Sequence, residues 1–209
     1  MACYPVKTTV VKNRKDTYSM KRIARWRLLI LGDSISASYG LELTQGWVAG
    51  LERALRETYS DCTVINASVF GATTADGLKL LPGLLEKHQP NLIVVELGGN
   101  DVLKASPLPS LKENLSRLVD TAQQGGALVV LAPAEAPGEH GGRYAAGVRK
   151  VFREIAERFS CVLAPFILEN IYQEPDLMQN DGIHPNAAAQ AQMAQTMLPS
   201  ILSAMDGRT

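Results

Sequence analysis

The sequence LLILGDS, at residues 28–34, decides the fold that we expect for this chain of 209 residues. Four aliphatic residues in succession are typical of a strand that is covered on both faces by other elements. The glycine and the two polar residues that follow would lie at the carboxyl end of this strand. In open parallel sheets, ligands bind outside the carboxyl ends of the strands. The stretch therefore predicts a buried parallel strand and, directly after it, a candidate functional site.

Outward from this stretch, short aliphatic runs alternate with longer segments of helical periodicity, which is typical of a parallel sheet with helices on both faces. The predicted strands are residues 28–31, 63–67, 92–97, 128–131 and 161–164. The predicted helices are residues 46–59, 74–88, 110–124, 144–159 and 185–205. Pro185 would open the last of them, where its missing N–H does no harm. We therefore predict a three-layer, doubly wound α/β fold with a five-stranded parallel sheet in the flavodoxin-like order 2-1-3-4-5.

Composition and charge exclude several classes of function. Lys and Arg together number 21, as do Asp and Glu, so no net charge points to a nucleic acid or an acidic surface as partner. A small, mostly neutral substrate is the better expectation. The three cysteines are far apart and form no CxxC pair, which indicates neither a disulfide framework nor a zinc site. Because no apolar run approaches the roughly 20 residues that span a bilayer, we expect no stable membrane insertion.

The first 24 residues differ in composition from the rest of the chain. Lys and Arg are scattered among polar residues there, and no apolar stretch of about seven residues marks a secretory signal. We expect residues 1–24 to be a disordered basic extension and residues 25–209 to form a single domain. A cytoplasmic location is the corresponding expectation.

The chemistry is expected to depend on a serine, a histidine and an aspartate. The sequence DGIHP, at residues 181–185, places a carboxylate three residues before an imidazole. A serine hydroxyl is a poor nucleophile unless a base takes its proton, and the base works best when an acceptor holds it in one tautomer. We therefore predict Ser34 as the nucleophile, His184 as the base and Asp181 as the residue that orients His184.

Other polar residues near these segments have plainer interpretations. His88 lies at the end of a predicted helix, and His140 lies in a glycine-containing loop, so neither competes well for the role of base. Asp33 is interpreted as a cap for the turn after the first strand, and Asp101 as a carboxylate that holds a loop. The charged residues of the helix at 144–159 are interpreted as a solvated face.

Four blocks of this sequence, in this order, resemble the blocks of the SGNH hydrolases, also called the GDSL family. They are GDS at residues 32–34, Gly71, GGND at residues 98–101 and DGIHP at residues 181–185. The resemblance covers the chain from about residue 27 onward. The runs around the last two blocks look most like the bacterial subgroup with acyl-CoA thioesterase, arylesterase and lysophospholipase activities. Because similar proteins are often exported, a periplasmic or secreted location stands as an alternative.

The resemblance also implies roles for individual residues. It implies an oxyanion hole made of the backbone N–H groups of Ser34 and Gly71 and the side-chain amide of Asn100, with no metal or organic cofactor. By the same comparison, the substrate-binding candidates are Ile35, Val102, Leu103 and Ile183. The chain departs from the family pattern at Ser38, where many relatives carry glycine, and in the segment at residues 102–107, which helps to shape the acyl pocket in the subgroup.

The expected function is therefore hydrolysis of carboxylic esters and thioesters through an acyl-enzyme on Ser34. Two alternatives remain: a carbohydrate O-acetyl esterase of the same superfamily, and a catalytically silent binding module with this fold. A nucleotide-binding flavodoxin-like domain is a rival for the fold alone, since fold does not determine function. Such a domain would leave the turn at residues 181–184 unexplained.

Overall fold

Five parallel strands form one sheet in the order β2-β1-β3-β4-β5, which confirms the predicted topology. The structure is a computed structural model that describes residues 25–136 and 140–207, so the predicted extension at residues 1–24 lies outside the described residues. The strands are β1 (Arg27–Gly32), β2 (Thr63–Asn66), β3 (Leu92–Glu96), β4 (Leu128–Leu131) and β5 (Val162–Leu163). The bounds of each strand differ from the predicted bounds by at most one residue at either end. Strand β1 lies between β2 and β3.

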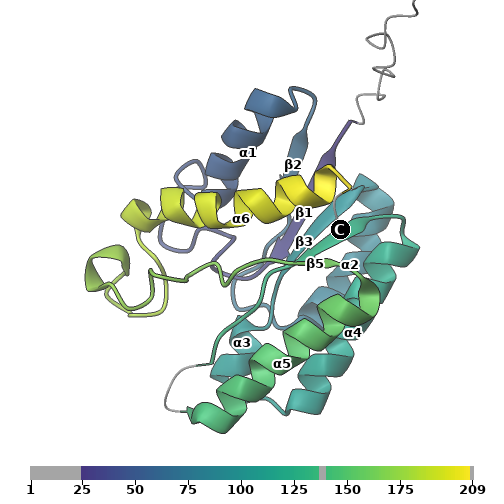
Figure 1. Ribbon diagram of the computed structural model, residues 1–209. Coiled ribbons are helices and arrows are strands. Elements are labelled where there is room, and N and C mark those ends of the chain that lie inside the picture. The colour runs from purple at the N-terminus through teal and green to yellow at the C-terminus, as the bar shows by residue number, and fades with distance from the viewer. Residues whose placement is uncertain (1–24, 137–139, 208–209) are drawn as a thin grey trace, which may run out of the picture.

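Helices cover both faces of the sheet (Figure 1). They are α1 (Trp47–Thr58), α2 (Thr74–His88), α3 (Gly99–Leu103), α4 (Leu108–Gln124), α5 (Gly142–Phe159) and α6 (Gln190–Met205), with short 3-10 helices η2 (Pro175–Leu177) and η3 (Ala187–Ala189). Figure 1 shows α1 and α6 on one face and α2, α4 and α5 on the other. Within the described ranges, no helix has the length and apolar character needed to cross a membrane.

The core consists of two hydrophobic clusters, one on each face of the sheet. Along β1, Leu28 and Ile30 belong to the cluster under α1 and α6, whereas Leu29 and Leu31 belong to the cluster under α2, α4 and α5. All four side chains are almost fully buried. Successive side chains of a strand point to opposite faces, so an uninterrupted aliphatic run supplies both clusters at once. This burial fixes the end of β1 and the turn that carries Ser34.

The start of the last helix differs from the prediction. Pro185 does not open a helix but pairs with Met178 in an antiparallel bridge. Asn186 caps the first helical turn instead, since its side-chain oxygen accepts a hydrogen bond from the N–H of Ala188 (2.9 Å), and α6 itself begins only at Gln190. The predicted boundary is wrong because an Asn cap starts the turn more effectively than a proline at this place. His184 consequently lies in a turn before the helix.

The short helix α3 is absent from the prediction. Its sequence, GNDVL, follows Gly98, and glycines favour a loop. Gly98 has a left-handed φ of 118°, and a Cβ there would lie 3.1 Å from the ring of Phe152. The glycine therefore permits a sharp turn against the core, and this turn leads from β3 directly into the helix that carries Asn100.

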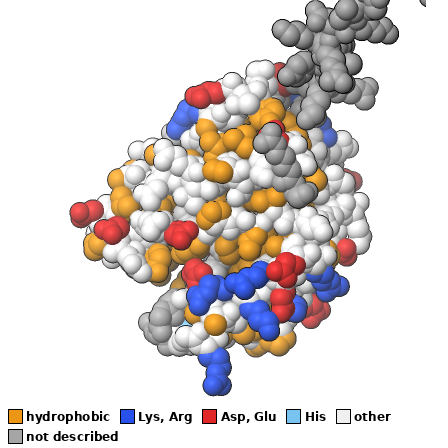
Figure 2. All heavy atoms as spheres, viewed as in Figure 1, with side chains coloured by type: hydrophobic (Ala, Val, Ile, Leu, Met, Phe, Trp, Pro, Cys, Tyr) orange, Lys and Arg blue, Asp and Glu red, His pale blue; other side chains and the backbone are white. Residues whose placement is uncertain are grey.

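The outer face of α5 is charged, as predicted. Figure 2 shows Lys, Arg, Asp and Glu side chains gathered over the part of the surface where α5 lies in Figure 1. Two of its side chains make ion pairs with other elements, Arg149 with Glu135 (2.9 Å) and Glu154 with Lys112 (2.6 Å). These groups are exposed to solvent, so such pairs contribute little to stability.

Candidate active site

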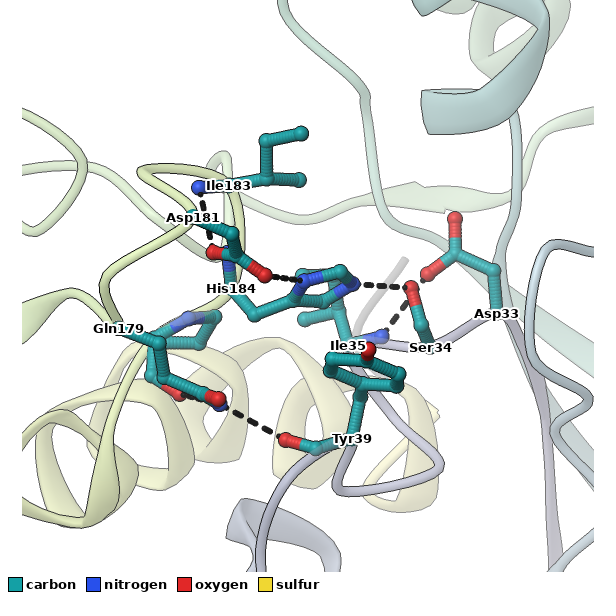
Figure 3. A network of polar contacts seen from close by, with 9 residues as sticks. Asp33, Ser34, Ile35, Tyr39, Gln179, Asp181, Ile183 and His184 are labelled. Carbon is teal, nitrogen blue, oxygen red and sulfur yellow. Dashed lines mark hydrogen bonds and ion pairs between the residues drawn. The ribbon is translucent and has the colours of Figure 1, made fainter.

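Ser34, His184 and Asp181 form a continuous chain of polar contacts at the carboxyl end of β1 (Figure 3). Ser34 Oγ lies 2.8 Å from His184 Nε2, and His184 Nδ1 lies 2.7 Å from Asp181 Oδ2. Ser34 and His184 are 150 positions apart in the sequence. The fold therefore brings together the three residues that the sequence singled out.

The Asp181 carboxylate is held in place by the turn that it belongs to. Its Oδ1 accepts hydrogen bonds from the backbone N–H groups of Ile183 (2.9 Å) and His184 (3.0 Å). These bonds, with the one from the His184 side chain, lower the pKa of Asp181 to about 2. An ionised carboxylate only accepts hydrogen bonds, so it favours the tautomer in which His184 Nδ1 carries the proton. Nε2 is then free to accept the proton of Ser34.

Two other serines in the same turn have different surroundings. Ser36 is fully buried, and its hydroxyl donates a hydrogen bond to Glu96 Oε2 (2.7 Å). Ser38 is also buried, and its φ of 61° lies in the left-handed region. The departure from glycine at position 38 therefore keeps the backbone conformation that a glycine would favour. Of the three hydroxyls, that of Ser34 contacts the imidazole.

Two backbone donors lie in the segments that follow β1 and β2. Within residues 25–136 and 140–207, neither the N–H of Ser34 nor that of Gly71 has a hydrogen-bond acceptor. Gly71 has a φ of 72°, which glycine adopts without strain. A Cβ at this position would meet no atom within 4 Å, so the conformation and not the space calls for glycine.

Asn100 lies on α3, which follows β3. Its side-chain Nδ2 donates hydrogen bonds to Asp33 Oδ2 (3.0 Å) and to the backbone oxygen of Ala72 (3.1 Å). The amide is thereby fixed between the segments that follow β1 and β2. Ser34, Gly71 and Asn100 come from the ends of the three adjacent strands β1, β2 and β3.

Comparison with known proteins identifies the family of this chain. The model of the GDSL-like lipase/acylhydrolase family matches residues 30–192, a range that includes Ser34, Gly71, Asn100, Asp181 and His184. The chain belongs to this family. The resemblance predicted from the four sequence blocks is therefore confirmed.

Individual known proteins are similar to this chain over most of their length. Esterase TesA of Pseudomonas aeruginosa is 40% identical over 181 residues, which cover 87% of this chain and 90% of the relative. The thioesterase 1/protease 1/lysophospholipase L1 of Escherichia coli is 38% identical over 170 residues, or 81% of this chain and 80% of the relative. A crystal structure of the psychrotrophic esterase EstA from Pseudoalteromonas sp. matches with a TM-score of 0.82 and 37% identity, covering 86% of this chain and 98% of the other.

Asp33, the middle residue of the GDS block, does more than cap a turn. Its Oδ1 accepts the N–H of Ile35 (3.0 Å), as a cap would, but its Oδ2 accepts the side-chain amide of Asn100. Burial raises the pKa of Asp33 to about 6, although the hydrogen bonds oppose this shift. Asp33 therefore links the turn of Ser34 to the amide of Asn100.

Glu96, the last residue of β3, is a buried acid that the sequence analysis did not single out. Its carboxyl accepts the hydroxyl of Ser36, and backbone N–H groups of Asp33 and Ser36 also donate to it. Burial, and then the charge of Asp33, raises the pKa of Glu96 well above its ordinary value of 4.5. Glu96 lies in an aliphatic strand, and its partners are about 60 positions away, so no local pattern marks it.

We expect the substitution Glu96→Gln to weaken the pH dependence of stability. The folded state keeps a proton on Glu96 that the unfolded chain releases above about pH 4.5, so wild-type stability falls as pH rises from there. Glutamine has no such proton to lose, and only the smaller contribution of Asp33 remains. Thermal unfolding at a series of pH values from 5 to 8 measures the slope, with the exposed residue Glu57 changed to Gln as the control. Equal slopes for Glu96→Gln and the wild type would contradict this prediction.

Asp101 holds a loop, as predicted. Its carboxylate accepts two hydrogen bonds from Thr74, one from the backbone N–H (2.9 Å) and one from the hydroxyl (2.6 Å). Thr74 is the first residue of α2, so this pair ties α3 to the segment that follows Gly71.

The predicted substrate-binding residues have different surroundings. Leu103 and Ile183 are 44% and 47% exposed, whereas Ile35 is half-buried against the core. Val102 is fully buried in the cluster under α2, α4 and α5, and the prediction that it contacts the substrate does not fit this burial. Its side chain supports α3 from inside.

Two exposed aromatic residues near the site are absent from the sequence prediction. The ring of Tyr39 stacks on the imidazole of His184, with centroids 4.2 Å apart, and the ring of Phe70 meets Tyr39 edge-on at 5.5 Å. Phe70 directly precedes Gly71 in the sequence, which is the only local signal that could have indicated it.

The remaining histidines lie elsewhere in the fold. His88 is the last residue of α2, as predicted, and His140 meets the ring of Tyr144 on α5 edge-on at 5.9 Å. Among the described residues, no group of three or more His, Cys, Asp or Glu side chains is arranged to hold a metal ion.

Proposed function

We propose that this protein hydrolyses carboxylic esters and thioesters through an acyl-enzyme on Ser34. The proposal rests on one observation above all, the chain of contacts from Ser34 Oγ to His184 and from His184 to Asp181 at 2.8 and 2.7 Å. It is supported by the relatives, which are named as an esterase, an arylesterase and a thioesterase/lysophospholipase.

The first half-reaction transfers the acyl group to the enzyme. Ser34 Oγ attacks the carbonyl carbon while His184 Nε2 takes its proton. The resulting tetrahedral intermediate carries a negative oxygen, to which the N–H groups of Ser34 and Gly71 and the amide of Asn100 donate. When the intermediate collapses, His184 gives its proton to the departing oxygen or sulfur, and the alcohol or thiol leaves.

The second half-reaction releases the acid. His184 Nε2 takes a proton from a water molecule, whose oxygen attacks the acyl-enzyme, and the oxyanion is stabilised by the same donors. His184 then returns the proton to Ser34 Oγ as the carboxylic acid departs. Asp181 stays ionised throughout and stabilises the imidazolium.

Asn100 must change a hydrogen bond to take part. Both hydrogens of its amide are already used, by Asp33 and by the Ala72 carbonyl. A developing oxyanion accepts hydrogen bonds more strongly than a neutral carbonyl does. We therefore expect the oxyanion to replace Ala72 as a partner of Asn100, while Asp33 keeps the amide oriented.

Replacing Asn100 by alanine is expected to lower kcat by about 100- to 1,000-fold, the usual effect of losing one oxyanion donor. The backbone donors of Ser34 and Gly71 remain, so some activity persists. Steady-state kinetics on p-nitrophenyl acetate measure the loss, with circular dichroism to check the fold. The control is Asn114→Ala on α4, whose amide bonds to Thr74 and not to the site. A loss of less than tenfold for Asn100→Ala would remove Asn100 from the oxyanion hole.

The function itself is tested by labelling and turnover together. A fluorophosphonate probe is expected to label the wild-type protein at Ser34 and to block hydrolysis of both a p-nitrophenyl ester and an acyl-CoA. Release of acetate from acetylated xylan, without hydrolysis of the other two substrates, would favour the carbohydrate esterase instead. A protein that is neither labelled nor active on any of the three substrates would be a silent binding module, and the proposal would fail.

A further inference from the structure

Exposed apolar side chains lie in the segments that follow the two strands beside β1. Because β1 lies between β2 and β3, the segments that follow these two strands flank the turn of Ser34, and adjacent strands are only about 4.8 Å apart. Val69 and Phe70 follow β2 and are 47% and 59% exposed, whereas Leu103 lies on α3 after β3. An ester has two arms, the acyl group and the leaving group, and each arm can thus meet a separate apolar surface.

The surface on the β2 side is continuous with the catalytic base. Tyr39 stacks on His184 with an angle of 30° between the ring planes, and Phe70 meets Tyr39 at 84°. Figure 3 shows the Tyr39 ring against the imidazole whose other contacts are Ser34 and Asp181. We call Tyr39 and Phe70 the aromatic wall. Tyr39 is 44% exposed and Phe70 is 59% exposed, so both rings offer surface to a ligand.

Gln179 ties the wall to the segment that carries the base. Its side-chain Nε2 donates hydrogen bonds to the backbone oxygens of Tyr39 (2.8 Å) and Pro185 (3.0 Å), and its backbone N–H donates to the oxygen of His184 (2.7 Å). A Cβ at Gly40 would collide with the Gln179 side chain, so the two segments are closely packed. Tyr39 therefore keeps its position relative to the imidazole.

The chemistry decides which arm of the substrate meets the wall. The departing oxygen or sulfur must lie at His184 Nε2, because that nitrogen gives it a proton. The leaving group therefore begins beside the imidazole, and the exposed aromatic surface that adjoins this imidazole is Tyr39, followed by Phe70. The acyl arm then extends away from the imidazole, and we assign it to the side of α3, where Leu103 is exposed.

We infer that Tyr39 and Phe70 form a leaving-group subsite that favours aromatic alcohols and thiols over small aliphatic ones. The inference rests on the proposed ester hydrolysis at Ser34. Edge-to-face or offset contacts between aromatic rings add a favourable binding free energy that corresponds to about three- to tenfold in a rate ratio. The wall is thus a determinant of specificity for the leaving group.

The test compares kcat/KM for benzyl acetate and ethyl acetate, which share the acyl group and have leaving alcohols of similar acidity. We expect the benzyl-to-ethyl ratio to fall about three- to tenfold in Phe70→Leu, which keeps an apolar side chain but removes the ring. The ratio of ethyl hexanoate to ethyl acetate, in which only the acyl group differs, is expected to stay unchanged. Phe70 is exposed, so the substitution is compatible with folding.

Two further variants complete the comparison. Tyr39→Leu is expected to lower the benzyl-to-ethyl ratio and also kcat for every ester, because the ring that supports His184 is lost, and Tyr39→Phe is expected to restore both. Leu103→Ala is the matched control on the other side of Ser34, where the hexanoate-to-acetate ratio should fall and the benzyl-to-ethyl ratio should not. If Phe70→Leu changed the hexanoate-to-acetate ratio but left the benzyl-to-ethyl ratio unchanged, the inference would be overturned. An unlabelled and inactive wild type would instead refute the proposed function itself.

Discussion

Replacing Ser34 by alanine is expected to abolish hydrolysis of esters and thioesters, with a loss on the order of a millionfold, as for the nucleophile of another serine hydrolase. Ser34 Oγ is the atom that bonds to the acyl group, and the nearby Ser36 cannot replace it. The hydroxyl of Ser36 is buried against Glu96 and not beside the imidazole. Steady-state kinetics on a p-nitrophenyl ester measure the loss, and mass spectrometry follows the acyl-enzyme.

The fold is expected to survive this change, because the side-chain hydroxyl of Ser34 bonds to His184 and not to a core residue. Ser110→Ala, at an exposed position on α4, serves as the matched control and should keep full activity and full labelling by a fluorophosphonate. If Ser34→Ala kept more than about one per cent of wild-type activity with its fold intact, a mechanism through this serine would be untenable.

The strands and the three catalytic candidates could be predicted because their signals are local. Each buried strand is an aliphatic run of a few residues, and the polar residues directly after it identify the end where ligands bind. The sequence DGIHP also carries a local signal, since a carboxylate three residues before a histidine can reach the imidazole within one turn. The contact between Ser34 and His184 itself depends on the connection that leads from β5 back toward β1, which the sheet order does not specify.

The contacts of the site that escaped prediction are non-local. Glu96 occupies one position of an aliphatic strand, and only the fold shows that it lies beneath the turn of Ser34. The stacking of Tyr39 on His184 joins two loops whose packing depends on Gln179, and no periodicity encodes such a contact. Val102 is similar, since a helix that the sequence did not reveal turns its side chain into the core.

Replacing Asp181 by asparagine is expected to lower kcat by about 10,000-fold with little change in the fold, because His184 would adopt the wrong tautomer. Oδ1 of Asp181 accepts two backbone N–H groups, those of Ile183 and His184. An asparagine can satisfy these donors only with its oxygen, so its NH2 group must face His184 Nδ1. Nδ1 then has to accept a hydrogen bond, the ring proton moves to Nε2, and Nε2 can no longer take the proton of Ser34.

The tautomer can be observed separately from the rate. Nitrogen NMR of the neutral imidazole should show the proton of His184 on Nδ1 in the wild type and on Nε2 in Asp181→Asn. Asp176→Asn is the matched control, since Asp176 lies on η2 in the same connection and is expected to leave both the spectrum and kcat unchanged. If Asp181→Asn lost activity while the proton stayed on Nδ1, the carboxylate would act mainly through its charge, by stabilising the imidazolium. If activity survived, a backbone carbonyl or water would have to orient His184 in its place, and Asp181 would not belong to the catalytic group.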